Sequence, residues 1–132
     1  MADAVYPLIL EAFATKAVSW TADTVKMILV TSGYTFSTSH QYITDLGANI
    51  VARSPALGSK TATAGVLDAA DTTVVSVSGS TVTQLVLSFD NGTDATSRLI
   101  AHITSYTGLP LTPTGADVPI IFPSDSNKIM TI

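Results

Sequence analysis

The chain contains no cysteine, so disulfide bonds, thiolate nucleophiles and zinc sites with Cys ligands are all excluded. Glutamate occurs once, at Glu11, and glutamine and arginine are scarce, so good helix-forming residues are few. Threonine, valine, serine and isoleucine, which favour strands and turns, are plentiful instead. The composition therefore predicts a protein that is mainly β.

Charge is scarce as well, because charged residues make up 12% of the chain and hydrophobic residues 46%. A typical soluble domain carries about 25% charged residues. The six basic residues are scattered and the net charge is −4, so we expect no binding of nucleic acid through its phosphates. The longest apolar run, Met27 to Val30, is far shorter than the ~20 residues that span a bilayer, and the amino terminus lacks the basic region of a secretory signal. We therefore expect no membrane partner.

The surplus of apolar over charged residues predicts contacts with other proteins. A single domain of 132 residues buries somewhat under ~70% of its unfolded surface, so part of the apolar content stays outside the core. Disorder is excluded, because it requires low hydrophobicity and high charge. We expect a surface of serine, threonine, alanine and glycine, with apolar area reserved for neighbouring subunits.

Glycine-containing turn signals recur about every ten residues, which is the spacing of an antiparallel sandwich or barrel. We expect one domain over residues 1–132, all-β and mainly antiparallel, β-sandwich or jelly-roll-like, with one or two short helices near the N-terminus. The turn signals are Ser32-Gly33, Leu46-Gly47, Leu57-Gly58, Ser78-Gly79, Asn91-Gly92, Thr107-Gly108 and Thr114-Gly115.

A short helix is expected to begin at Pro7, because proline suits a first helical turn and apolar residues follow at helical spacing. A second helical or irregular piece is expected over residues 39–46. Strands are expected over residues 24–30, 49–53, 60–67, 72–77, 81–89, 98–104, 118–122 and 128–132. Alternation within 81–89 and the apolar character of the large side chains predict five core residues, namely Trp20, Leu85, Leu87, Phe89 and Phe122.

No arrangement of residues supports catalysis. His40 and His102 are the only imidazoles and each stands alone in the sequence, so a structural role is favoured over metal binding or catalysis. Neither a Gly-x-Ser-x-Gly elbow nor a glycine-rich phosphate loop occurs. We expect a protein that is not an enzyme, with no catalytic residue, no cofactor and no metal ion.

Side-chain oxygens gather between Asp90 and Asp94, where Asn91 and Thr93 also lie. They would suit a calcium ion, but the segment lacks the acidic spacing and terminal glutamate of an EF-hand. Because Asn91-Gly92 tolerates the positive φ of a tight turn, a hairpin connection is the favoured interpretation.

The order of several segments along the chain resembles a family of small virion proteins of tailed bacteriophages. The segments are Trp20-x-x-Asp23-Thr24-x-Lys26 with residues 27–30, Tyr34 to Phe36 with His40-x-Tyr42-x-x-Asp45-Leu46, residues 60–61 with 65–69, residues 95–101, residues 108–117, and Asn127-Lys128-Ile129. The resemblance spans nearly the whole chain, and none of the segments is a catalytic signature.

This resemblance implies a non-enzymatic structural component of the particle. The leading expectation is a capsid decoration, or cement, protein that binds the exterior of the capsid after assembly in the cytoplasm of the bacterial host. Its partners would be subunits of the major capsid protein and other copies of itself, as a dimer or trimer. The alternative is a tail, baseplate or head-fibre component that binds a receptor or carbohydrate, with Trp20, Tyr34 or Tyr106 stacking on sugar rings.

Two stretches combine aromatic or apolar side chains with serine, threonine or proline, as protein interfaces do. The alternative for each stretch is that its large side chains complete the core. The candidate interface residues are Tyr34, Phe36, His40 and Tyr42 in the first stretch, and Tyr106, Leu109 and Pro110 in the second.

Overall fold

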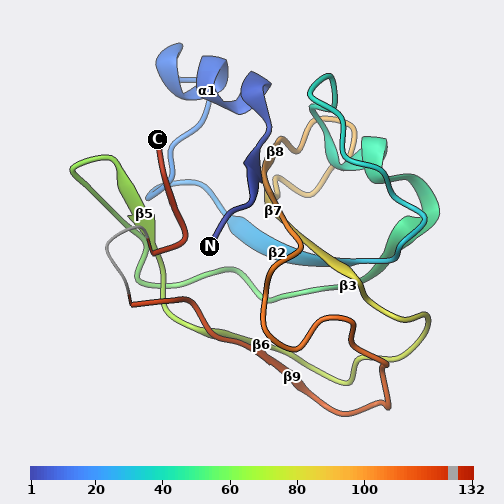
Figure 1. The fold of residues 1–132 in the computed structure, drawn as a ribbon. Coiled ribbons are helices and arrows are strands. Elements are labelled where there is room, and N and C mark those ends of the chain that lie inside the picture. The colour runs from blue at the N-terminus through green and yellow to red at the C-terminus, as the bar shows by residue number, and fades with distance from the viewer. Residues whose placement is uncertain (125–127) are drawn as a thin grey trace.

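The computed structural model describes residues 1–124 and 128–132, and within them the fold is all-β and mainly antiparallel, as the composition predicts (Figure 1). Asn127 of the last family-like segment lies outside the described residues. The helices are α1 (Pro7–Ala14) and the 3₁₀ helix η1 (Ile43–Asn49). The strands are β1 (Ala4–Val5), β2 (Val25–Val30), β3 (Ile50–Arg53), β4 (Thr61–Thr63), β5 (Val66–Asp68), β6 (Thr72–Val74), β7 (Gln84–Phe89), β8 (Leu99–Ile103), β9 (Val118–Ile120) and β10 (Met130–Thr131).

A five-stranded antiparallel sheet in the order β1-β8-β7-β2-β3 forms the centre of the molecule. Strands β2 and β7 pair without interruption, from Val25 opposite Phe89 to Val30 opposite Gln84. Register shifts interrupt the pairing of β2 with β3 and of β7 with β8, beside Val30 and Ser88. A bulge of this kind increases the local twist of a sheet.

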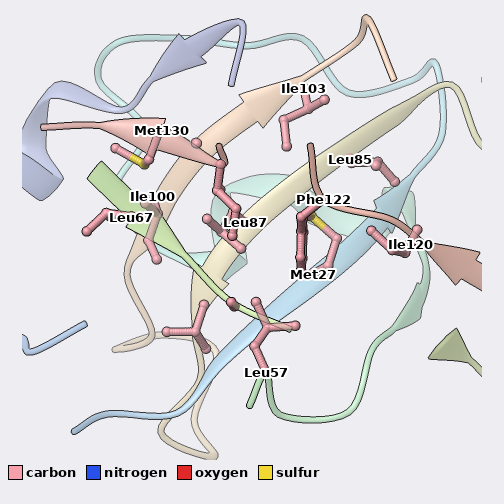
Figure 2. Close-up of a cluster of buried hydrophobic side chains, with 14 of the residues drawn as sticks. Met27, Leu57, Leu67, Leu85, Leu87, Ile100, Ile103, Ile120, Phe122 and Met130 are labelled. Carbon is pink, nitrogen blue, oxygen red and sulfur yellow. The ribbon is translucent and has the colours of Figure 1, made fainter. Parts of the chain in front are cut away.

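One face of this sheet carries the larger core cluster. Met27, Leu85 and Leu87 point from the sheet toward Phe122 and toward three residues of the smaller β elements, namely Leu67, Ile120 and Met130 (Figure 2). Those elements are a three-stranded sheet, β10-β5-β4, and a two-stranded ribbon, β6-β9. All five predicted core residues are buried, which confirms that part of the sequence analysis.

The opposite face of the sheet is also covered. Ile28, Val30 and Val86 point away from the larger cluster and pack with Tyr6, Tyr34, Ile43, Leu46 and Leu99 in a second one. The segment 31–49 therefore forms a cover over this face. Every residue of β7 and β8 is buried as a result, and the sheet shows no face of alternating polar residues.

Because the central sheet is covered on both faces, the core contains more of the hydrophobic residues than the sequence analysis expects. Among the described residues, four large hydrophobic side chains are exposed: Leu10 at 46%, Val75 at 65%, Ile121 at 53% and Ile132 at 50%. The expected apolar exterior is thus small, because a sheet buried on both faces needs apolar residues on both.

The strand expected over residues 60–67 is wrong, because the chain turns within it. Ala64 and Gly65 both have positive φ (52° and 79°), and they join β4 to β5 as a two-residue hairpin with Thr63 opposite Val66. Positive φ at both positions is typical of a type I′ turn, whose twist matches that of paired strands.

The helices differ in how well they follow the expectation. Helix α1 begins at Pro7, as expected, and directs Ile9 and Ala12 into the core. The second helical piece lies at Ile43–Asn49 rather than at residues 39–46. Its start is fixed by the carboxylate of Asp45, which accepts hydrogen bonds from the backbone amides of Gln41 and Tyr42.

Candidate interaction surface

The first predicted stretch forms the outer part of the cover. Tyr34 is 5% exposed, and its hydroxyl lies 2.7 Å from the hydroxyl of Tyr6 and 2.7 Å from Nδ1 of His40. Burial raises the pKa of both tyrosine hydroxyls, so they remain neutral hydrogen-bonding groups. Tyr34 is thus a core residue of the cover.

A side chain from the sheet holds the cover in place. Gln84 donates from Nε2 to the carbonyls of Thr31 (2.7 Å) and Tyr34 (2.9 Å). Its Oε1 therefore accepts from Nε2 of His102, at 2.5 Å. Burial lowers the pKa of His102 and the nearby Asp3 opposes this, so the ring is neutral at pH 7 with its proton on Nε2. His102 has the hydrogen-bonded role that the sequence analysis favoured.

The other aromatic residues of this stretch are half-buried. The ring of Phe36 stacks on His102 with centroids 5.2 Å apart, and it also contacts Tyr6. The guanidinium of Arg98 lies over the ring of Tyr42, with Cζ 5.6 Å from the centroid of the ring. These contacts bind the stretch to the sheet and leave only parts of Phe36, His40 and Tyr42 on the surface.

The second predicted stretch lies on the other side of the sheet. The hydroxyl of Tyr106 accepts a hydrogen bond from the amide of Ile121 (2.9 Å) and donates to the carbonyl of Pro119 (3.4 Å). Leu109 is half-buried, Pro110 is exposed, and the peptide bond between them is cis. The central sheet, whose strands β7 and β8 are buried along their whole length, separates this stretch from Tyr34, so the candidate residues form two separate surfaces.

An apolar hollow of ≈ 270 Å³ opens between this loop and β9, and we call it the Tyr106 hollow. Leu29, Val82 and Leu85 of the core contribute to its lining, together with residues of the loop and of β9. A shallower hollow of ≈ 470 Å³ lies next to it and shares Tyr106, Thr107 and Ile121. The lining residues of the Tyr106 hollow are Leu29, Val82, Leu85, Tyr106, Thr107, Gly108, Leu109, Leu111, Val118, Pro119, Ile120 and Ile121.

The ribbon β6-β9 presents an exposed outer side beside this hollow. Thr72, Val74 and Ile120 turn inward, whereas alternate positions are exposed. Together with the Tyr106 hollow, this outer side is called the docking face below. It consists of Thr73 and Pro119 on the ribbon and of the exposed residues that flank its strands, namely Asp71, Val75, Asp117 and Ile121.

Val75 and Ile121 were missed as candidate surface residues. Val75 directly follows Val74, and Ile121 lies between Ile120 and Phe122, so the sequence gives no signal of which of these apolar side chains faces outward. Pro119 and Asp117 indicate only that this strand is not a buried interior strand, because proline and aspartate are disfavoured there.

The segment between Asp90 and Asp94 is a connection between two paired strands, as favoured, and its carboxylates are already matched by cations. Arg53 holds both carboxylate oxygens of Asp94 at 2.8 Å, and this hydrogen bonding lowers the pKa of Asp94. Asp90 lies 3.3 Å from Lys26 and 3.9 Å from Arg53. A polar hollow of ≈ 370 Å³ adjoins Asp90 and Asn91.

The rings expected to stack on sugar are mostly inaccessible. Trp20 is 4% exposed, with its indole N–H donating to the carbonyl of Asp68 (3.3 Å), and Tyr34 is 5% exposed. The prediction that Trp20 or Tyr34 stacks on a sugar ring is therefore wrong, because both rings are buried. Tyr106 alone of the three is partly exposed.

Over residues 1–124 and 128–132, no three His, Asp or Glu side chains gather in a way that would hold a metal ion. In the same part of the chain, no helix has both the length and the apolar character needed to cross a bilayer. Comparison with models of known protein families and with curated proteins finds no match.

Proposed function

We propose that this chain is a non-enzymatic structural protein of a tailed-phage particle, a decoration protein that binds the outside of the capsid shell. The observation that carries the proposal is the docking face. It carries two of the four large hydrophobic side chains that are exposed among the described residues. Ile121 follows β9 and lines the Tyr106 hollow, and Val75 follows β6 at the other end of the ribbon. The order of the family-like segments supports the phage setting.

The energetics of this surface suit a protein that binds many identical sites. Fully burying one large aliphatic side chain contributes about 1.5–3 kcal/mol, so Val75, Ile121 and the hollow supply a modest contact. Repetition around a shell converts modest contacts into high avidity when copies are linked. Most of the remaining exposed residues are small and uncharged, so ordering them at a contact costs little side-chain entropy.

The test is binding to DNA-free heads of the parent phage that lack the protein. The wild-type chain should sediment with the heads in a fixed ratio and raise the temperature at which they break. Ile121→Glu and Val75→Glu should each weaken binding at least tenfold, because a desolvated carboxylate at an apolar contact is unpaired.

Leu10→Glu is the matched control. Leu10 is similarly exposed, at 46%, but lies on α1 at the opposite end of the molecule from β6 and β9 (Figure 1). This variant should bind heads as the wild type does. Sedimentation with purified tails instead of heads would replace the decoration role with the tail role, and no binding to either would refute the proposal.

A further inference from the structure

The Tyr106 hollow has the size and chemistry to receive one large apolar side chain. A cavity of about 150 Å³ can hold a benzene ring, whereas sites for whole small molecules begin at about 300 Å³. The hollow, at ≈ 270 Å³, falls between the two. Its one side-chain phenol, that of Tyr106, already bonds to the backbone of Pro119 and Ile121. An apolar group therefore fits better than a polar ligand.

The charged side chains that flank this hollow among the described residues are carboxylates. Asp117 directly precedes β9, and its Oδ1 accepts from the amide of Ser76 at 2.9 Å. Asp71 lies at the other end of the ribbon, where its Oδ1 accepts from the amide of Phe122 at 2.8 Å. In the described part of the chain, neither carboxylate forms a salt bridge.

The basic side chains lie elsewhere. Lys26 and Arg53 pair with Asp90 and Asp94, and Lys128 pairs with Asp68. Lys60 bonds to the carbonyl of Asp23, Arg98 lies over Tyr42, and Lys16 follows the end of α1. The N-terminal ammonium of Met1, which lines the neighbouring shallower hollow, bonds to the carbonyl of Lys128. The docking face is thus an apolar surface bounded by carboxylates, and its electrostatic complement is an apolar group flanked by cations.

This distribution argues against a second copy of the chain as the occupant. A two-fold contact places the same surface on both subunits. The docking faces of two copies would therefore bring the carboxylates of both copies together, with no basic side chain of either face to pair with them. Like charges brought together at an interface disfavour the contact. The complementary surface must belong to a different chain.

We propose that the Tyr106 hollow receives one aromatic or large aliphatic side chain of a partner protein, and that a neighbouring Lys or Arg of that partner meets Asp117 or Asp71. The inference rests on the proposed function only in taking a coat subunit as the partner. The chemistry of the contact can be tested without any phage particle.

The probes are 2-phenylethylammonium, 2-phenylethanol and phenylacetate, which share a ring and differ in charge. Titrated into the ¹⁵N-labelled protein, they should shift the amide resonances of Gly108, Leu111 and Ile121. The cation should bind about three- to tenfold more tightly than the anion, with the alcohol between them, because exposed ion pairs contribute modestly.

The double variant Asp71→Asn/Asp117→Asn should bind the alcohol as before and lose the preference for the cation. Glu11→Gln removes a carboxylate on α1, far from the ribbon (Figure 1), and should keep the preference. Absence of shifts at these amides, or equal binding of cation and anion, would overturn the inference.

The two proposals fail separately. If the wild-type chain binds heads but shows no preference among the probes, the partner chemistry is refuted and the decoration role stands. If the preference is present and heads are not bound, the decoration role is refuted and the contact chemistry stands.

Discussion

The side chain of Tyr106 completes the hydrogen bonding of β9 at the amide of Ile121. Its hydroxyl accepts from that amide at 2.9 Å and donates to the carbonyl of Pro119 at 3.4 Å. Pro119 lies opposite Thr73 of β6, and its carbonyl and the amide of Ile121 face Tyr106 on the outer edge of the ribbon. A phenol here takes the place of a neighbouring strand, and the edge is protected from pairing with another chain.

Tyr106→Phe removes this bridge and keeps the ring. We expect a loss of about 0.5–1.5 kcal/mol in the free energy of unfolding, which urea titration measures. Hydrogen exchange should become faster at the amide of Ile121. The amide of Phe122 bonds to Asp71 and provides the internal control, so equal acceleration at both amides would contradict the assignment.

Gln84→Leu should destabilise the protein by about 2–4 kcal/mol. The change leaves the carbonyls of Thr31 and Tyr34 and the Nε2–H of His102 without partners in a buried place. Gln41→Leu is the matched control, because no hydrogen bond of the Gln41 side chain occurs within the described residues, and it should cost less than ~0.5 kcal/mol. Similar losses for the two variants would argue against the role of Gln84 in holding the cover.

Acid should weaken the cover through His102. Burial lowers its pKa in the folded state below the ordinary 6.5, with Asp3 opposing the shift, so the unfolded chain binds the proton more tightly. Stability is therefore complete above pH 6.5 and falls as the pH decreases from 6.5 toward the folded-state pKa. Unfolding free energies measured from pH 7.5 to 5 should show this slope.

His102→Gln should reduce the slope between pH 7.5 and 5, even though its stability at pH 7.5 is lower. Burial raises the pKa of Asp3, whose charge acts on His102, but the hydrogen bonds that its carboxylate accepts from Thr104 and Ser105 lower the pKa below 3.8 overall, so Asp3 stays charged in this window. An unchanged slope in the variant would assign the pH dependence to another group.

Calcium ions and EDTA should leave the thermal midpoint unchanged, because Lys26 and Arg53 already supply positive charge to Asp90 and Asp94. Asp94→Asn should cost about 0.5–1 kcal/mol, the range of a partly exposed ion pair. A rise of several degrees on adding calcium would restore the calcium-loop alternative.

Ala64→Asn should stabilise the protein by up to about 1 kcal/mol. Ala64 has φ of 52°, a left-handed conformation that costs an ordinary L-residue about 1–2 kcal/mol and that asparagine adopts more readily. Ala62→Asn, in the neighbouring exposed strand β4, is the control and should not stabilise. Differential scanning calorimetry distinguishes the two.

The hairpin at Ala64-Gly65 shows what local patterns miss. The other turns that contain glycine carry serine, asparagine, threonine or leucine before it, whereas alanine before glycine gave no reason to interrupt a strand. The all-β class, α1 and most strands follow from local signals, namely Pro7, β-branched residues and glycine spacing. Each of these signals depends on residues that are close together in the sequence, and the folded chain keeps the local conformation that they favour.

The interaction surface depended on information that no local pattern carries. Whether Tyr34 is a contact residue or a core residue is decided by Tyr6 and Gln84, 28 and 50 residues away. The cover from residues 31–49 also buries Ile28, although nothing near this residue in the sequence announces the cover. Tyr106, Leu109 and Pro110 were chosen from composition, while Val75 and Ile121 became visible only through the pairing of β6 with β9.

The buried sheet also divides the molecule into two sides that can be altered independently. Thr38 and Ser39 are exposed on the cover, across the sheet from Val75 and Ile121. A fluorophore or a foreign epitope inserted at Thr38–Ser39 would therefore lie on the side of the sheet opposite the docking face. Under the function proposed above, the insert would point away from the shell and leave the proposed contact undisturbed.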